Sequence, residues 1–195
     1  LVNGFSPAPS GEALYYDTPA YRPFWAEVER LGVPFYLHPR DPLPDRLKAY
    51  EGHPWLVGSP WGFAEETALH ALRLIGCGLF DIHPGLQIIL GHLGERIPYD
   101  LWRLDHRLTK VPGLKLQRSM GDYFRANFHL TTSGHFSTHT LLHAMMEVGV
   151  ERILFSVDYP FVDNPPGTQW MQHVPVATED FKKIMSGNAE RLLRL

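Results

Sequence analysis

The sequence has 195 residues, of which 44% are hydrophobic and 20% are charged, and its formal net charge is −3. This composition is typical of a globular domain and excludes a disordered chain or a coiled coil. Because 18 Lys and Arg residues are balanced by 21 Asp and Glu residues, the composition offers no electrostatic signal for nucleic acid or an anionic membrane. We therefore expect a small-molecule partner, no nucleic acid and no membrane.

The single cysteine, Cys77, excludes an intramolecular disulfide framework and a cysteine-based zinc site. No apolar run reaches the roughly 18 residues of a membrane span, and the first residues lack the basic flank and apolar region of a signal peptide. These features predict a cytoplasmic protein. Because the sequence lacks an initiator Met and opens as if at the end of a strand, we expect residues 1–195 to be a single catalytic-type domain that is incomplete at its N-terminus.

Apolar residues spaced by three or four predict helices, and short continuous apolar runs predict strands buried on both faces. In chain order we expect a helix at 21–31, a strand at 33–38, a helix at 65–80, a strand at 86–92, a helix at 97–108, a strand at 128–134, a helix at 138–148, a strand at 153–158, and helices at 178–184 and 189–195. Asn188 is expected to be the N-cap of the last helix. Alternating strands and helices predict a parallel sheet, either doubly wound or a (β/α)₈ barrel. The glycine fingerprints of nucleotide-binding sheets are absent, which disfavours the first.

Three predicted strands end in a residue that can bind a metal or transfer protons, namely His38, His92 and Asp158. Any one of them could equally be a polar residue that caps its strand. Because the carboxyl ends of parallel strands gather at one edge, we expect the three to converge there. Neutral imidazole and carboxylate suit Zn²⁺, Mn²⁺ or Fe²⁺. The sequence therefore predicts a metal-binding and proton-transfer site at this edge.

Glu95 follows His92 by three residues, across a glycine that lets the chain turn sharply. This spacing can place the carboxylate within hydrogen-bonding distance of the imidazole, which fixes its tautomer and raises its basicity. The alternative is that Glu95 caps the helix predicted from residue 97. His135, in the loop after the third predicted strand, is a further histidine that we expect near the pocket.

Three arginines on the helix predicted at 97–108, or directly before it, share one helical face. They are Arg96, Arg103 and Arg107. A surface rich in guanidinium groups suits either a carboxylated substrate or an intersubunit salt bridge, and the sequence does not decide between them.

Six short runs in this order and spacing resemble one family. They are NGFS at 3–6, YLHPR at 36–40, LGHLGE at 90–95, TTSG at 131–134, SVDYPF at 156–161 and GNAERL at 187–192. Together they resemble the amidohydrolase-related aromatic acid decarboxylases of the 2,3-dihydroxybenzoate and gamma-resorcylate decarboxylase type, over the whole chain. The resemblance implies a distorted (β/α)₈ TIM barrel of the metal-dependent hydrolase type. Only its C-terminal half, from the end of strand 4 through strand 8, is expected in this chain.

The resemblance also implies roles for particular residues. His38 and Asp158 would bind one divalent metal ion, Zn, Mn or Mg. Asp158, with His92 and Glu95 behind it, would be the catalytic proton relay. We expect four further residues to contact the substrate, namely Asn3, Phe5, Phe161 and Arg103.

The activity implied by the resemblance is that of a carbon–carbon lyase, a carboxy-lyase that reversibly removes CO₂ from a hydroxybenzoic acid and leaves a phenol. The substrate would be a small aromatic carboxylate, and the protein a homodimer or homotetramer. The family's first strand supplies two more metal ligands, and no matching motif occurs here. We therefore expect weak metal binding and little activity unless the missing strands are supplied. Two alternatives stay open, a metal-dependent amidohydrolase or lactonase and a truncated, non-catalytic relative.

Overall fold

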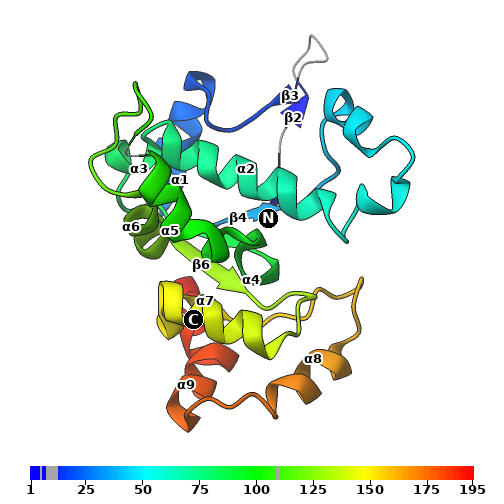
Figure 1. Ribbon diagram of the computed structural model, residues 1–195. Helices are drawn as coiled ribbons and strands as arrows, with labels where there is room; N and C mark the ends of the chain where they lie inside the picture. Colours follow the sequence, from blue (N-terminus) through cyan, green and yellow to red (C-terminus); the bar gives the residue numbers. More distant parts are fainter. Residues whose placement is uncertain (5, 8–12, 109) are drawn as a thin grey trace.

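The computed structural model describes residues 1–4, 6–7, 13–108 and 110–195 (Figure 1). Its five-stranded sheet has the order β1-β4-β5-β6-β7, and every neighbouring pair in it is parallel. The strands are β1 (Val2–Asn3), β4 (Phe35–His38), β5 (Ile88–Leu90), β6 (Phe128–Thr131) and β7 (Ile153–Leu154). Two further strands, β2 (Ser6–Pro7) and β3 (Ala13–Leu14), form a separate antiparallel pair. The parallel βαβ order predicted from the sequence is confirmed.

Helices connect the strands of the sheet and also follow the last strand, β7. They are α1 (Arg22–Leu31), α2 (Gly62–Gly76), α3 (Leu79–Ile82), α4 (His92–Glu95), α5 (Ile97–Leu108), α6 (Met120–Asn127), α7 (Thr138–Val148), α8 (Asn164–Met171), α9 (Thr178–Lys182) and α10 (Asn188–Leu193). Short 3₁₀ segments are η1 (Pro19–Tyr21), η2 (Pro44–Tyr50), η3 (Pro54–Leu56) and η4 (Val150–Arg152), and η5 (Lys183–Gly187) is π-helical. In Figure 1 the first half of the chain, blue to green, lies above the second half, yellow to red. Within the described ranges, every helix is too short or too polar to cross a membrane.

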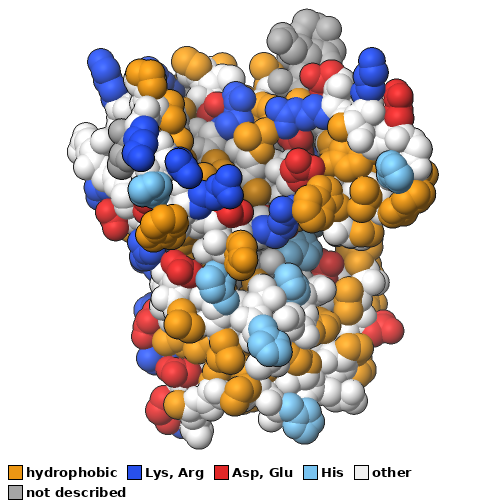
Figure 2. Space-filling view, viewed as in Figure 1, with side chains coloured by type: hydrophobic (Ala, Val, Ile, Leu, Met, Phe, Trp, Pro, Cys, Tyr) orange, Lys and Arg blue, Asp and Glu red, His pale blue; other side chains and the backbone are white. Residues whose placement is uncertain are grey.

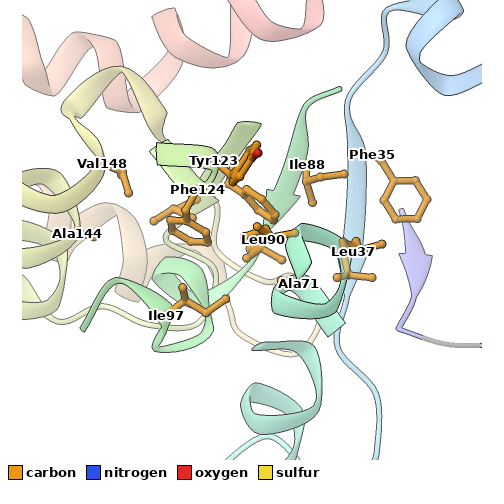
Figure 3. Close-up of a cluster of buried hydrophobic side chains, with 14 of the residues drawn as sticks. Phe35, Leu37, Ala71, Ile88, Leu90, Ile97, Tyr123, Phe124, Ala144 and Val148 are labelled. Atoms are coloured by element: carbon orange, nitrogen blue, oxygen red, sulfur yellow. The ribbon is translucent and has the colours of Figure 1, made fainter. Parts of the chain in front are cut away.

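One face of the sheet packs against helices in a hydrophobic cluster (Figure 3). The strand side chains in it are Phe35, Leu37, Ile88, Leu90, Phe128, Leu130 and Ile153, each at most 5% exposed. The helical side chains include Ala71 of α2, Ile97 and Leu101 of α5, and Tyr123 and Phe124 of α6. Burying a side chain of this size stabilises the fold by about 1.5–3 kcal/mol.

The opposite face of the sheet carries polar side chains on β4 and β6, with the apolar Ile89 of β5 between them. Side chains alternate along a strand, so Tyr36 and His38 of β4 lie on one face, as do His129 and Thr131 of β6. Of these, His38 and Thr131 lie at the carboxyl ends of their strands, and His129 lies near the amino end. The sheet therefore offers two separate polar regions, one at the carboxyl ends of its strands (the carboxyl edge) and one at their amino ends (the amino edge).

Asn188 does not cap the last helix from outside, as the sequence suggested, because η5 continues directly into α10 and leaves no free helix start. Its side chain is instead fully buried and joins two segments through hydrogen bonds. Its Nδ2 donates to the carbonyls of Val150 and Ile153, both at 2.8 Å, and its Oδ1 accepts from Arg191 at 2.9 Å. The side chain thereby ties α10 to the start of β7.

Asn188→Ala is expected to lower the free energy of unfolding by about 2–4 kcal/mol, because two buried carbonyls lose their donor. Asn164→Ala is the matched control. Asn164 is exposed at the start of α8, so its loss should change stability by about 0.5 kcal/mol or less. Urea unfolding of both variants measures the difference, and equal effects would contradict the crosslinking role of Asn188.

His70 of α2 is fully buried between two tyrosine rings. Its Nε2 accepts a hydrogen bond from the backbone N–H of Tyr16 at 2.9 Å, which requires that nitrogen to be unprotonated. Burial lowers the pKa of His70 from 6.5 to about 4. The folded chain therefore holds this imidazole neutral at pH values where the unfolded chain would protonate it.

This pKa shift predicts acid destabilisation. Between about pH 6.5 and pH 4 the unfolded state binds more protons at His70 than the folded state does. The contribution of His70 to stability is therefore complete above pH 6.5 and decreases as the pH falls toward the folded pKa. The lowered pKa corresponds to about 3 kcal/mol. Urea unfolding between pH 7 and pH 4 gives the free energy of unfolding at each pH. The slope of this free energy against pH should be smaller for His70→Gln than for the unaltered chain. His173→Gln, at an exposed position, should leave the slope unchanged. If His70→Gln kept the full slope, the buried neutral imidazole would not be its source.

Candidate active site

Directly after β5 the chain makes one turn of left-handed helix. Residues 92 to 96 have successive φ angles of 50°, 56°, 86°, 51° and 72°, and only Gly94 among them lacks a Cβ. A left-handed conformation costs roughly 1–2 kcal/mol for each non-glycine residue. The N–H of Gly94 donates to the carbonyl of Gly91 at 2.8 Å and closes the turn. Backbone strain of this kind gathers at functional sites.

The left-handed turn brings His92 and Glu95 together. The imidazole Nδ1 lies 2.6 Å from Glu95 Oε1, so the hydrogen bond expected from their spacing is present. Glu95 is only 2% exposed, and its carboxylate is buried against His92. Because Nδ1–H donates to Glu95, the second nitrogen, Nε2, points to the other side, where Asp158 Oδ2 lies 3.7 Å away.

The two carboxylates control the charge of His92. Burial alone would lower the pKa of His92, but the hydrogen bond to Glu95 and the negative charges of Glu95 and Asp158 outweigh burial and raise it. His92 therefore holds a proton more readily than a free histidine does. An imidazole between two carboxylates is arranged to accept a proton on one side and pass it on.

Asp158 lies in the loop that follows β7. Its φ is 76°, and its carbonyl accepts hydrogen bonds from the N–H groups of Phe161 and Val162 at 2.9 and 3.1 Å, which makes a tight turn. Gly134, in the loop after β6, packs against its carboxylate, and a Cβ at Gly134 would lie 3.2 Å from Asp158 Oδ2. The glycine therefore allows the two loops to approach closely.

His38 ends β4 at the same edge of the sheet. In the sheet register Leu37 is level with Leu90, and His38 follows Leu37 as Gly91 follows Leu90. The Nδ1 of His38 is buried and has no hydrogen-bond partner within the described ranges. A buried ring nitrogen without a partner costs free energy, which fits an imidazole whose environment is completed by another group.

The fit to a metal ion is partial. In the part of the chain that the structure describes, no three or more His, Cys, Asp or Glu side chains are grouped so that they could hold one. His38 and Asp158 have the donor chemistry for two ligand positions. Further ligands would have to come from outside the described residues.

The predicted substrate contacts are more dispersed. Asn3 pairs with His38 in the sheet, and its carbonyl accepts from Tyr16 Oη at 2.6 Å. Phe161 is 79% exposed. Phe5 lies outside the described residues. We call His92, Glu95 and Asp158 the His92 group. Phe161 contacts it through its backbone N–H, which donates to the Asp158 carbonyl. Among the described residues, no hydrogen bond or ion pair joins the Arg103 side chain to this group.

Arg103 lies on α5 in a different surface. A cavity of about 990 Å³ lies between α2, α5 and the 42–61 segment. Arg96, Arg103 and Arg107 all line it, in agreement with the prediction that they share one helical face. Of the His92 group only Glu95 lines it. Figure 2 shows Lys and Arg side chains gathered in the upper half of the view, where Figure 1 places α2 and α5. The arginine face thus borders the site from the helical side.

Sequence reasoning missed Tyr36. Its hydroxyl lies 3.1 Å from Thr131 Oγ1 and 3.3 Å from Ser133 Oγ. Burial raises the pKa of Tyr36, and the charges of Asp158 and Glu95 add to this. The signal was present in the strand period, because Tyr36 precedes His38 by two residues and shares its face.

His135, which was expected near the pocket from the sequence, contacts the turn that carries His92. Its Nδ1 is 3.3 Å from the carbonyl of His92 and can donate to it. This contact joins the loop after β6 to the left-handed turn after β5.

The sequence matches the amidohydrolase family (Amidohydro_2) over residues 2–195. The chain belongs to this family. It is 55% identical to a gamma-resorcylate decarboxylase of Rhizobium radiobacter and 53% identical to one of Rhodococcus jostii (strain RHA1). Each match covers 100% of this chain and 61% of the relative, so the chain spans about three-fifths of the length of these relatives.

Solved structures give the same picture. A 2,6-dihydroxybenzoate decarboxylase complexed with 2,6-dihydroxybenzoate is 55% identical with a TM-score of 0.96, over 100% of this chain and 61% of that one. A dihydroxybenzoic acid decarboxylase from Polaromonas sp. JS666, with bound manganese and 2-nitroresorcinol, is 50% identical with a TM-score of 0.96, over 100% and 60%. The expected family and the expected fold, an α/β chain forming part of an amidohydrolase-type barrel, are confirmed.

Proposed function

We propose that this chain is part of a metal-dependent, nonoxidative decarboxylase that removes CO₂ from a hydroxybenzoic acid and leaves a phenol. The observation that carries the proposal is the placement of His92 between Glu95 and Asp158 at the carboxyl edge of the sheet. The identity of 51–55% to four gamma-resorcylate decarboxylases over the whole chain supports the same reaction. Because the chain spans 61% of those relatives, the activity is proposed for the complete protein.

The reaction needs a proton at the ring carbon that bears the carboxylate. Adding this proton interrupts aromaticity, and the electrons of the breaking C–C bond then restore it as CO₂ leaves. We assign delivery of the proton to Asp158, with His92 as the group that reprotonates it and Glu95 as the group that holds His92 in one tautomer. Each turnover consumes one proton, because a carboxylate leaves as neutral CO₂. The 3.7 Å between His92 and Asp158 must shorten for transfer.

One divalent metal ion, Zn, Mn or Mg, is proposed as the cofactor, with His38 and Asp158 among its ligands. Manganese in the Polaromonas relative supports this choice. When bound, the ion supplies Lewis-acid stabilisation of negative charge on the substrate oxygens. Asp158 can serve in both roles because Oδ2 faces His92, which leaves its other oxygen for a ligand position.

The proposed substrate is a small aromatic carboxylate, with Asn3, Phe5, Phe161 and Arg103 as its contacts. We also propose that the protein is cytoplasmic and that it assembles as a homodimer or homotetramer. Large exposed side chains on α5 and α7 support assembly, since Tyr99, Trp102 and Met146 are 81%, 74% and 86% exposed. Residues of these types are enriched at protein interfaces.

The test is to incubate the complete protein with 2,6-dihydroxybenzoate and other hydroxybenzoates, and to measure CO₂ and phenol. Equimolar CO₂ and phenol, lost on chelation and restored by Mn²⁺, are the expected result. Ring opening of a lactone panel without CO₂ release would instead assign the protein to the hydrolases. Failure to turn over either panel, with no stoichiometric metal, would indicate a non-catalytic relative.

A further inference from the structure

A second cavity, of about 430 Å³, lies at the amino edge of the sheet, opposite the His92 group. Pro34 precedes β4, Gln87 precedes β5, His129 is the second residue of β6, and Arg152 precedes β7. All four line this cavity, since parallel strands begin at one edge. Its volume lies in the range of small-molecule sites.

Three arginines line this amino-edge cavity. Arg152 is half-buried, and its Nη1 donates to Gln87 Oε1 at 2.8 Å and His129 Nε2 at 2.9 Å. Both acceptors are neutral, and within the described ranges Arg152 forms no ion pair. Burial, followed by the positive charge of Arg191, lowers the pKa of Arg152, and the negative charge of Glu151 offsets this only in part. Two more arginines, Arg191 and Arg194, lie at the exposed rim.

The two carboxylates of the lining are already occupied. Glu29 bonds the His83 imidazole at 2.8 Å and accepts the backbone N–H of Gly85 at 2.8 Å. Glu151 pairs with Lys183 at 2.9 Å. Among the described residues, neither carboxylate forms an ion pair with an arginine of this cavity. The arginines of the cavity therefore have no carboxylate in direct contact with their guanidinium groups.

His129 adds a second unsatisfied group. It is 6% exposed, and because its Nε2 accepts from Arg152, the ring proton lies on Nδ1. That Nδ1 is buried and has no hydrogen-bond partner in the described part of the chain. Burial, followed by the charges of Arg152 and Arg191, lowers the pKa of His129 to about 3. Its neutral ring keeps Arg152 in place without neutralising it.

We propose that the amino-edge cavity binds a small oxyanion, a phosphate or a carboxylate, held by Arg152 with Arg191 and Arg194 at the rim. Guanidinium groups bind such anions because their planar donors match paired oxygens. The site shares no residue with the His92 group and lies at the other edge of the sheet. It is therefore distinct from the proposed decarboxylase site.

The experiment is thermal unfolding of the purified protein with increasing inorganic phosphate or, separately, malonate, at constant ionic strength set with chloride. We expect a saturable rise in Tm with half-saturation below about 1 mM for at least one of them. The anion that acts identifies the source, phosphate or carboxylate. Arg152→Gln should abolish the rise. Arg30→Gln, at an exposed arginine paired with Glu27 outside this cavity, should retain it.

A second measurement, on the unaltered protein, tests the proposal even where Arg152→Gln folds poorly. The ¹⁵N resonances of the His129 ring in the unaltered protein should shift on addition of the active anion, whereas those of exposed His173 should not. Either of two results would overturn the proposal. One is the same rise in Tm for Arg152→Gln and the unaltered protein, and the other is no response of Tm or His129 to either anion.

Discussion

Asp158→Asn is expected to reduce decarboxylation by the complete enzyme by about 10³-fold or more, a loss within the range for removal of a general acid. The amide keeps the shape of the side chain, but it cannot carry the proton that His92 would supply across the present 3.7 Å separation. It also replaces a charged carboxylate by a neutral amide at the proposed metal-ligand position, which should weaken metal binding. The measurement is kcat for CO₂ release from a hydroxybenzoate, with the urea midpoint checked to show that folding is retained.

Asp163→Asn is the control for Asp158→Asn. Asp163 stands five residues further along the same loop and is exposed at the start of α8, without a side-chain capping bond to the described helix. We expect its rate to stay within about twofold of the unaltered enzyme, as for a surface substitution. A rate for Asp158→Asn within about tenfold of the unaltered enzyme would remove Asp158 from the reaction.

The proposed relay depends on two loops that are separate in the sequence. The turn after β5 supplies His92 and Glu95, while the loop after β7 supplies Asp158. Gly134 and His135, from the loop after β6, contact both of them, through Asp158 Oδ2 and the carbonyl of His92. A change in the middle loop should therefore alter the relay without touching its residues.

Much of the fold could be predicted because its signals are local. The helices at 97–108 and 138–148 have the bounds that their apolar spacing predicted, and the strand at 33–38 contains β4. Their periodicity is long enough to reveal one buried face. Alternation of such elements then leads to a parallel sheet without further information.

Besides the left-handed turn α4, helices α6 and α8 escaped prediction, for different reasons. The eight residues of α6 make about two turns, which is too short for a clear period, although Tyr123 and Phe124 are buried. The sequence of α8 contains Pro165, Pro166 and Gly167, which usually indicate a loop. Proline is tolerated in the first helical turn because the N–H it lacks would be unpaired there.

The site was predictable where its geometry follows from spacing or from a residue's place at the end of a strand. The bond between His92 and Glu95 depends on three residues of separation, so the sequence contained it. The left-handed backbone around it was not predictable, since residues with a Cβ avoid this conformation. The approach of Asp158 to His92 was expected, because both follow the carboxyl ends of parallel strands. The exposure of Phe161 was not, because it depends on the tertiary packing of a loop.

Gly94→Ala is expected to lower the free energy of unfolding by about 2–5 kcal/mol and to reduce decarboxylation together with it. At a φ of 86° an added Cβ is strained, and here it would also lie 3.0 Å from Leu130 Cδ2 and 3.1 Å from Pro98 Cδ. Relief of these contacts requires the left-handed turn to move, which pulls Glu95 away from His92. Urea unfolding and kcat are the two measurements.

Gly113→Ala separates backbone strain from crowding. Gly113 has a similar φ of 91°, but no described atom lies within 4 Å of an added Cβ. Alanine there should cost about 1–2 kcal/mol, from the left-handed conformation alone, and should leave kcat unchanged. The ¹⁵N shifts of the His92 ring should change in Gly94→Ala and stay constant in Gly113→Ala, because only the first disturbs the bond to Glu95. Equal stability loss in both variants, with kcat retained, would mean that the turn does not position His92.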